Sequence, residues 1–212
     1  MLLLKRFVTL CWLAVGLAGA LAAHAAQAPD ALIEKVSNEV IDTIKADKAI
    51  QGGDLKRINT LVDEKVMPYV DFERMTASAV GRYWRQATPE QHERLQHEFK
   101  TLLVRTYAGA LTQVRAQTTV QMKPMRASPT DNEVVVRTQV LGKGEPVQLD
   151  YRLEKAGDTW KIYDVNVLGV WLVEQYRNSF AQEIGTNGIE GLIGKLAERN
   201  KSAAPNGTSA KS

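Results

Sequence analysis

Residues 70–114 decide the fold, and they read VDFERMTASAVGRYWRQATPEQHERLQHEFKTLLVRTYAGALTQV. Thr88 is suited to cap a helix, Pro89 to occupy its first position, and Gln91 to complete a capping box. From there to the end of the stretch, apolar residues recur at three- and four-residue steps. This spacing predicts a long helix with one broad apolar face and a charged opposite face.

Helical periodicity also occurs on both sides of this helix. A shorter apolar stripe between Phe72 and Trp84 predicts a second helix just upstream. Because each helix has an apolar face, each needs another surface to pack against. Further helices are predicted from Pro29 to Gly52-Gly53, from Asp54 to near Pro68, beyond Gly169, and, after a break at Asn187-Gly188, as far as Leu196.

After Gln117 the period of the apolar residues changes from 3.6 to 2, which predicts β-strands. The clearest strand is VQLDYRLEK, residues 147–155, where apolar and polar side chains alternate. In WKIYDVNV, residues 160–167, the alternation changes phase, and a β-bulge near Ile162 would explain the change and curve the sheet. We therefore predict about four antiparallel strands with one dry face and one wet face.

Helices that precede and follow a run of strands predict an α+β fold. We expect the helices to pack on one face of a curved, roughly four-stranded antiparallel sheet. The chain of 212 residues suits one domain, which we predict over residues 26–201. The small and polar residues 202–212 predict a disordered tail.

The amino terminus has the pattern of a secretory signal. A basic pair precedes an apolar run over residues 7–23, and Ala23-His24-Ala25 fits the small-x-small rule of signal peptidase. We predict that residues 1–25 are a signal peptide cleaved after Ala25. An uncleaved membrane anchor is the alternative, but the run is short for a spanning helix. Cleavage would remove Cys11, so the exported chain would contain no cysteine and no disulfide.

Charge excludes one class of partner. The formal net charge is +3, and loss of Lys5 and Arg6 with the signal would take it to about +1. A nucleic-acid-binding protein normally carries a basic stripe, so we expect no nucleic-acid partner. No second long apolar segment occurs, and we expect the exported chain to be soluble.

The sequence holds little that an enzyme would use. His92 and His97 are five residues apart on a helix, so they do not share a face as the histidines of a zinc protease do. Asp150 and Asp164 are expected to be solvent-exposed, because both lie among polar neighbours on alternating strands. We therefore predict no catalytic residue, no bound metal and no cofactor.

Aromatic and aliphatic side chains dominate the faces that are predicted to point inward. For any one of them, ordinary core is the more frequent role. A filled core and a lined cavity use the same residue types, so the pattern fits both. From its residues alone, the chain is an exported α+β domain with a large apolar interior.

Two runs of the sequence resemble the MlaC family, also called the toluene-tolerance family of periplasmic phospholipid-binding proteins. The first is DFERM…GRYWRQATPEQ…FKTLLVRTYAGAL, within residues 71–111. The second is WKIYDVNVLGVWLVEQYRNSF, followed by IGTNGIEGLIGKL, within residues 160–196. Together they cover most of the chain after the signal, in the order typical of the family.

The resemblance implies a fold detail and a function. Members of the family carry a phospholipid through the periplasm, with its acyl chains in an apolar cavity between the helices and the curved sheet, an NTF2-like arrangement. For this chain it implies a periplasmic location, phospholipid as cargo and no enzymatic activity. It also implies two partners, an outer-membrane lipoprotein–porin complex and an inner-membrane ABC transporter with an MCE-domain subunit. Shuttling between them would maintain the lipid asymmetry of the outer membrane.

Carried onto this sequence, the lipid site falls on the inward stripes. Arg82, Arg85 or Arg152 is expected to meet the phosphate of the headgroup. Many members have serine where this chain has Trp171, and an indole there would shorten or reshape the cavity. The residues that the resemblance assigns to the lipid are Tyr83, Trp84, Phe99, Leu102, Leu103, Tyr107, Leu111, Val136, Leu149, Tyr151, Val165, Val167, Val170 and Trp171.

Three alternatives fit parts of the same pattern. A small NTF2-like enzyme would place an acid or a histidine inside the cavity, where this chain has valine, leucine and tyrosine. A structural or adaptor protein would have a solid core instead of a cavity. A carrier of hopanoids or other terpenoid lipids, within the same family, would use the same apolar stripes.

Overall fold

The computed structural model describes residues 27–125, 128 and 130–202. The predicted signal peptide, and the predicted tail beyond Ser202, lie outside these residues. The helices are α1 (Pro29–Ala46), α2 (Lys48–Gln51), α3 (Leu55–Leu61), α4 (Phe72–Val80), α5 (Pro89–Leu111) and α6 (Leu172–Ser202), with the short π- and 3₁₀-segments η1 (Val62–Val66), η2 (Met67–Tyr69) and η3 (Gly81–Gln86). The strands are β1 (Thr119–Met122), β2 (Glu133–Leu141), β3 (Val147–Ala156), β4 (Thr159–Val167) and β5 (Val170–Trp171).

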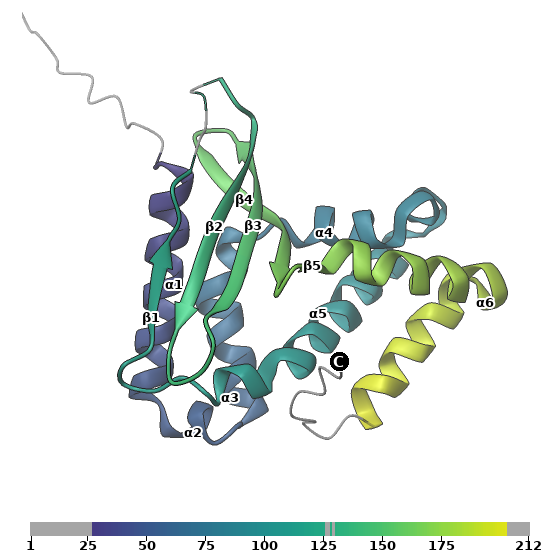
Figure 1. Cartoon of the computed structure of the whole chain (residues 1–212). Helices are drawn as coiled ribbons and strands as arrows, with labels where there is room; N and C mark the ends of the chain where they lie inside the picture. Colours follow the sequence, from purple (N-terminus) through teal and green to yellow (C-terminus); the bar gives the residue numbers. More distant parts are fainter. Residues whose placement is uncertain (1–26, 126–127, 129, 203–212) are drawn as a thin grey trace, which may run out of the picture.

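Figure 1 shows the sheet on one side of the molecule, with α4 and α6 grouped beside it. The helix α5 extends from that group towards the end of the sheet. The capping box at its start is confirmed, since the Gln91 N–H donates to Thr88 Oγ1 at 3.2 Å and the Thr88 N–H donates to Gln91 Oε1 at 3.0 Å. The predicted α+β fold is therefore confirmed, and its longest predicted helix begins where the sequence places it.

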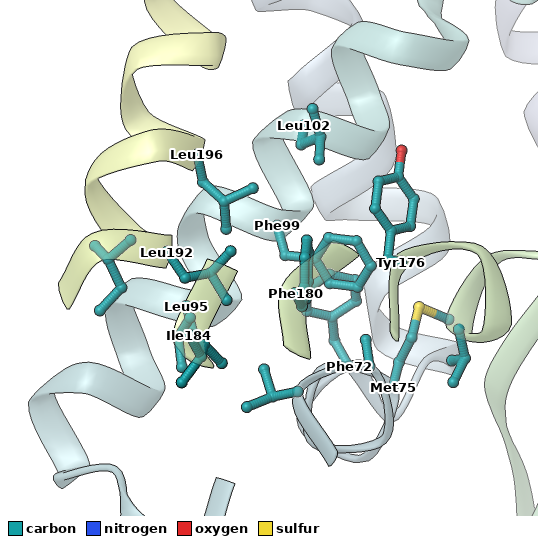
Figure 2. Close-up of a cluster of buried hydrophobic side chains, with 14 residues drawn as sticks. Phe72, Met75, Leu95, Phe99, Leu102, Tyr176, Phe180, Ile184, Leu192 and Leu196 are labelled. Atoms are coloured by element: carbon teal, nitrogen blue, oxygen red, sulfur yellow. The ribbon is translucent and has the colours of Figure 1, made fainter. Parts of the chain in front are cut away.

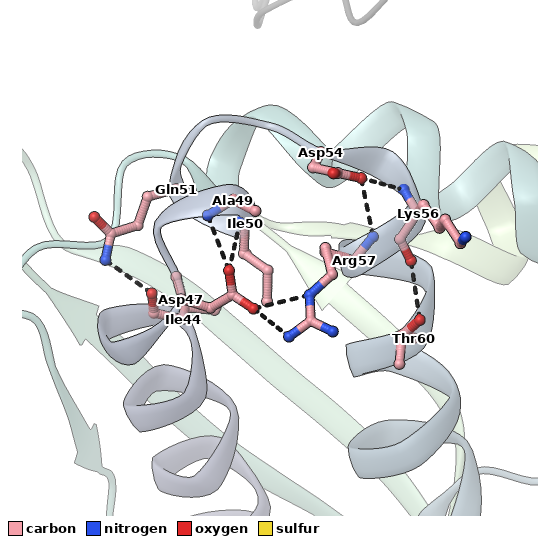
Figure 3. Close-up of polar contacts among 9 residues, drawn as sticks. All are labelled: Ile44, Asp47, Ala49, Ile50, Gln51, Asp54, Lys56, Arg57 and Thr60. Atoms are coloured by element: carbon pink, nitrogen blue, oxygen red, sulfur yellow. Dashed lines mark hydrogen bonds and ion pairs between the residues drawn. The ribbon is translucent and has the colours of Figure 1, made fainter.

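The predicted helix from Pro29 to Gly52-Gly53 is wrong in one respect, because it is broken at Asp47. Asp47 is extended, and its Oδ1 accepts the N–H groups of Ala49 and Ile50, which starts α2. Its Oδ2 accepts Nε and Nη2 of Arg57 at 3.0 and 2.6 Å (Figure 3). The Arg57 hydrogen bond lowers the pKa of Asp47 and ties α3 to the end of α1.

The sheet is antiparallel throughout, with its strands in sequence order. It has five strands instead of about four, because the two-residue strand β5 pairs with the end of β4. The predicted bulge is confirmed: Arg152 pairs with Asp164 and Leu153 with Ile162, which leaves Tyr163 as the extra residue. A bulge of this kind bends the strand and increases its local twist.

The register assigns each strand residue to one of two faces. Val136, Tyr151 and Val165 lie opposite one another on the face that packs on α1, here called the inner face. Arg152 and Asp164 lie opposite each other on the outer face. The predicted alternation of 147–155 is thus confirmed.

Three buried clusters form the core. The helical cluster joins α4, α5 and α6, and in it the rings of Tyr176 and Phe180 meet Phe99 edge-on at 5.1 and 5.2 Å (Figure 2). The sheet cluster packs Leu32, Ile33 and Val36 of α1 on Val134, Val136, Leu153, Trp160 and Ile162. The corner cluster consists of Ile41, Ile44, Ile50, Ile58, Leu61, Val104, Ala108 and Val114.

Helix α6 changes direction at Gly188, as the Asn187-Gly188 pair predicted. Gly188 has φ 71° and ψ −179°, a conformation that glycine adopts most readily. The segments before and after it both contribute to the helical cluster, through residues such as Ile184 and Leu192 (Figure 2). The turn therefore lets one continuous segment pack on α5 twice.

The expectation that Asp150 and Asp164 are solvent-exposed is wrong. Asp150 is 5% exposed and Asp164 only 1%. Asp164 is buried because its Oδ1 accepts the N–H of Val173 at 3.1 Å, in the first turn of α6, while its Oδ2 accepts Nη1 of Arg152 at 3.0 Å. Burial raises the pKa of Asp164, and these hydrogen bonds partly offset the rise. Alternation along a strand could not reveal that a helix begins over this position.

We predict that Asp164→Ala lowers the free energy of unfolding by about 2–4 kcal/mol, because it leaves the Val173 N–H without an acceptor and Arg152 without its buried partner. Urea denaturation followed by circular dichroism measures the loss. The matched control is Glu174→Ala, since Glu174 also pairs with Arg152, at 3.5 Å, but its side chain is 60% exposed. That control should change stability by less than about 0.5 kcal/mol. Equal, small effects of both variants would contradict the role of Asp164.

Candidate functional site

One end of the inner face carries apolar side chains that the core does not cover. Tyr107 of α5, Leu149 of β3, Val167 of β4 and Val170 of β5 are half-buried or exposed. Within the described part of the chain, none of the four belongs to the three clusters or to the partly buried residues packed against them. Leu149 lies directly opposite Val167, which in turn pairs with Val170. These residues form the candidate site.

Helix α5 carries three apolar residues at four-residue steps. Leu103 packs against the helical cluster and Leu111 against the corner cluster, while Tyr107 lies between them on the same face of the helix. All three are half-buried. The middle of α5 thus presents apolar surface that neither cluster covers completely.

Burial rises along the inner face, away from this end. At the exposed end, Val147 is 37% exposed and Val170 48%. In the next rows Leu149 and then Tyr151 are half-buried. In the row after that, Leu153 is fully buried in the sheet cluster. The apolar surface is therefore open at one end and filled at the other.

The sequence reasoning missed Leu168, which is 60% exposed at the open end. Leu168 has φ 53° and Gly169 has φ 92°, and these two residues connect the paired positions Val167 and Val170. A two-residue hairpin loop with both central φ angles positive is a type I′ turn, in which asparagine and glycine are the usual residues. Leucine is unfavourable there on backbone grounds alone. The sequence feature that could have predicted this turn is the pair Leu168-Gly169 between Val167 and Val170.

The other predicted site residues fall into two groups. Phe99, Leu102 and Val136 are fully buried core, so they do not line an open surface. Tyr83 and Trp84 pack against the helical cluster, and Trp84 stacks on His92 with ring centroids 3.8 Å apart. Of the predicted strand residues, Val165 packs against this same cluster.

Trp171 lies on the other side of the sheet from the candidate site. It pairs with Asn166, which lies opposite Asp150 on the outer face. Its ring lies 3.8 Å from the guanidinium carbon of Arg152, a cation–π contact. The expectation that this indole shortens a cavity is therefore wrong, because the two-residue turn gives Val170 the inner face and Trp171 the outer one.

The three arginines predicted for the headgroup are also separated. Arg152 is on the outer face and already pairs with Asp164 and Glu174. Arg82 and Arg85 are exposed on η3, and Arg82 Nη2 donates to the Tyr83 hydroxyl at 2.9 Å. The role of Arg82 and Arg85 stays a prediction, whereas the contacts of Arg152 point to a structural role.

Two tyrosines bring hydroxyl groups to this apolar region. Burial, and to a lesser degree the neighbouring Tyr176, raise the pKa of Tyr107 to about 12. Burial also raises the pKa of Tyr151, although hydrogen bonds with the side chains of Ser37 and Thr138 oppose the rise.

Two surface cavities lie elsewhere. One of about 400 Å³ is lined by Asp131, Glu133, Arg137 and their neighbours, and one of about 90 Å³ lies between α1 and α3 beside Arg57. Neither contains a residue predicted to bind lipid. An enclosed cavity behind the candidate site stays a prediction.

Among the residues that the structure describes, no cluster of three or more His, Cys, Asp or Glu side chains could hold a metal ion. None of the helices in this part of the chain has the length and apolarity needed to cross a membrane. His97 is exposed, as expected, but His92 is half-buried and its Nε2 lies 2.9 Å from the carbonyl oxygen of Trp84.

A family model described as MlaC protein matches residues 34–198. This chain belongs to the MlaC family. The resemblance seen in residues 71–111 and 160–196 is thereby confirmed.

Individual relatives of the MlaC family agree over most of the chain. The toluene tolerance protein ttg2D of Pseudomonas putida is 27% identical over 186 residues, which cover 84% of this chain and 86% of that protein. The intermembrane phospholipid transport system binding protein MlaC of Haemophilus influenzae is 24% identical over 180 residues, which cover 83% and 84%. A solved structure, the phospholipid-binding protein from Ralstonia solanacearum in complex with a phospholipid, is 49% identical, with a TM-score of 0.78 over 81% of this chain and 96% of that one.

We predict that Tyr107 of this MlaC-family chain ionises near pH 12, and that the folded state loses stability as the pH rises towards that value. An unfolded tyrosine loses its proton near pH 10, whereas burial keeps the proton on the folded chain up to about pH 12. Loss of the proton therefore stabilises the unfolded state relative to the folded state between these two values, and the free energy of unfolding falls. Ultraviolet absorbance of the phenolate, compared between wild type and Tyr107→Phe, measures the ionisation. A difference titration centred near pH 10 would contradict the burial of this side chain.

Proposed function

We propose that this chain binds a phospholipid by its acyl chains at the candidate site and carries it through the periplasm. The observation that carries the proposal is the group of apolar side chains at the open end of the inner face, Leu149, Val167 and Val170, which are half-buried or exposed. A monomeric protein normally buries such side chains unless they meet a ligand or a partner. The likeness to a phospholipid-binding protein that is 49% identical supports phospholipid as that ligand.

The binding energy of acyl chains limits how such a carrier can work. Each buried methylene contributes about 0.8 kcal/mol, so two chains of ordinary length amount to roughly 20 kcal/mol relative to water. Spontaneous release into water is then negligible. A bilayer solvates the chains about as well as an apolar site does, so direct transfer between the two is close to neutral. The carrier must therefore exchange its lipid while docked.

Exchange of lipid in the docked state requires partner complexes. We propose that the chain docks on an outer-membrane lipoprotein–porin complex and on an inner-membrane ABC transporter with an MCE-domain subunit, as a component that maintains outer-membrane asymmetry. The name of the Haemophilus influenzae relative, an intermembrane phospholipid transport system binding protein, supports such a system. Val147, Leu168 and Val170 are exposed, which supports an open end of the site that a docked partner can reach.

The other readings have less support. An NTF2-like enzyme would need an acid facing the site, but Asp150 and Asp164 lie on the outer face of the sheet. An adaptor with a solid core would cover Tyr107 and Leu149, which the three clusters leave half-buried. A hopanoid or other terpenoid carrier would use the same surface, so the identity of the extracted lipid separates it from a phospholipid carrier.

The headgroup is expected to stay at the open end, because its charge is costly to bury. If Arg82 and Arg85 bind its phosphate, reversing both charges to glutamate lowers the amount of retained lipid severalfold. Unchanged retention in Arg82→Glu/Arg85→Glu assigns the phosphate to other groups.

We predict that the purified chain retains a diacyl phospholipid, and that Leu149→Asp reduces the retained amount at least about tenfold, because a carboxylate at this position is costly to place against acyl chains. Native mass spectrometry followed by organic extraction measures the lipid. The matched control is Gln139→Asp, on the outer face of the neighbouring strand, which should retain lipid as wild type does. Circular dichroism confirms that both variants fold. A wild-type chain that carries no lipid and takes none up from vesicles would contradict the proposed function.

A further inference from the structure

The row of the inner face next to the filled core contains Tyr151, which is half-buried and packs against the sheet cluster. Tyr151 lies between Val136 and Val165 on the neighbouring strands. The row towards the open end contains Leu149 and Val167, which are half-buried. Tyr151 itself is half-buried, and it is the innermost residue of β3 on this face that is not fully buried before the core begins.

Beyond Tyr151 the inner face is filled. Leu153 pairs with Val134 on one side and Ile162 on the other, and the three are 0%, 8% and 3% exposed. Side chains of α1, including Leu32 and Ile33, pack on this row. An acyl chain that entered from the open end would have to displace a close-packed core to pass it.

Packing and polar neighbours restrict Tyr151. It packs against the sheet cluster, and its hydroxyl interacts with the side chains of Ser37, on α1, and Thr138, on the neighbouring strand. Thr138 is itself fixed, since it is 1% exposed and its Oγ1 donates to the Leu149 carbonyl at 2.9 Å. The ring therefore contacts both the sheet and the residues of α1 in that cluster.

We infer that Tyr151 is the floor of the lipid site and sets the longest acyl chain that the site accepts. This inference rests on the proposed function and adds to it the residue that determines chain-length specificity. Successive rows on one face are about 6.7 Å apart along a strand. Removal of the ring therefore extends the accessible length by a few methylenes, until Leu153 blocks it.

The acyl-chain length that the floor allows can be measured when the site competes with a bilayer for lipids of different length. The free energy that a methylene gains in the site is about equal to the free energy that it loses on leaving the bilayer. Occupancy is therefore independent of acyl-chain length for chains that fit the site. A methylene that does not fit loses its bilayer environment without compensation, which lowers occupancy roughly fourfold for each such methylene. The occupancy of a series of lipids therefore falls steeply at the length that the floor sets.

The experiment uses the full exported chain, stripped of lipid and incubated with vesicles that contain equal amounts of diacyl phosphatidylglycerols with saturated chains of about 12 to 20 carbons. Native mass spectrometry gives the occupancy by each lipid. We expect Tyr151→Ala to move the fall to chains at least about two carbons longer, and Val165→Phe, in the same row, to move it to shorter chains. The matched control is Tyr163→Ala, because Tyr163 lies in the bulge with its ring 3.8 Å from the guanidinium of Arg74, and it should leave the limit unchanged.

The outcomes separate this inference from the function on which it rests. A wild-type chain that takes up none of the lipids overturns the proposed function and the floor with it. Uptake with the same limit in wild type, Tyr151→Ala and Val165→Phe overturns the floor alone, as does uptake with no limit in wild type. If circular dichroism shows that Tyr151→Ala does not fold, Val165→Phe decides, and an unmoved limit in that variant overturns the inference.

Discussion

A buried carboxylate joins the sheet to helix α6. Asp164 belongs to the sheet, yet it accepts the N–H of Val173 in the first turn of α6. A charge in that position must be paired, and Arg152 pairs with it while its guanidinium lies against the Trp171 ring. The start of α6 is thereby fixed over the bulged strand. The packing of α6 residues such as Tyr176 and Phe180 in the helical cluster depends on where α6 starts.

Helix α5 explains why apolar surface remains uncovered. Its first half contributes Leu95 and Phe99 to the helical cluster, and its second half contributes Val104 and Ala108 to the corner cluster. Close-packed interiors normally leave few voids. A helix held at both ends by separate clusters cannot shift towards the sheet without disrupting one of them. Tyr107 lies between Val104 and Ala108 in the sequence but belongs to neither cluster, so its side chain stays half-buried. Such partly covered apolar surface fits a carrier whose site must stay open for its cargo.

Local features of the fold could be predicted from short stretches of sequence. The capping box at Thr88 and the bulge after Ile162 depend on residues only a few positions apart, and both occur where expected. The break at Asp47 was missed because the apolar periodicity continues across it, while the aspartate ends one helix and caps the next. Burial of Asp150 and Asp164 was missed for a different reason. The groups around them come from distant parts of the chain or from side-chain contacts, and the alternation of polar and apolar residues does not report either.

The sequence by itself determined the α+β class, the order and type of most elements, the inward stripes and the family, because periodicity, capping and turn chemistry act over a few residues. Only the tertiary structure decided which apolar residues are fully buried in the core and which stay half-buried. Phe99 and Tyr107 belong to the same helical stripe, but one is fully buried and the other is not. Val170 and Trp171 are neighbours, yet the turn before them sends one to each face. Such differences depend on strand register and on contacts between distant segments, which no local pattern records.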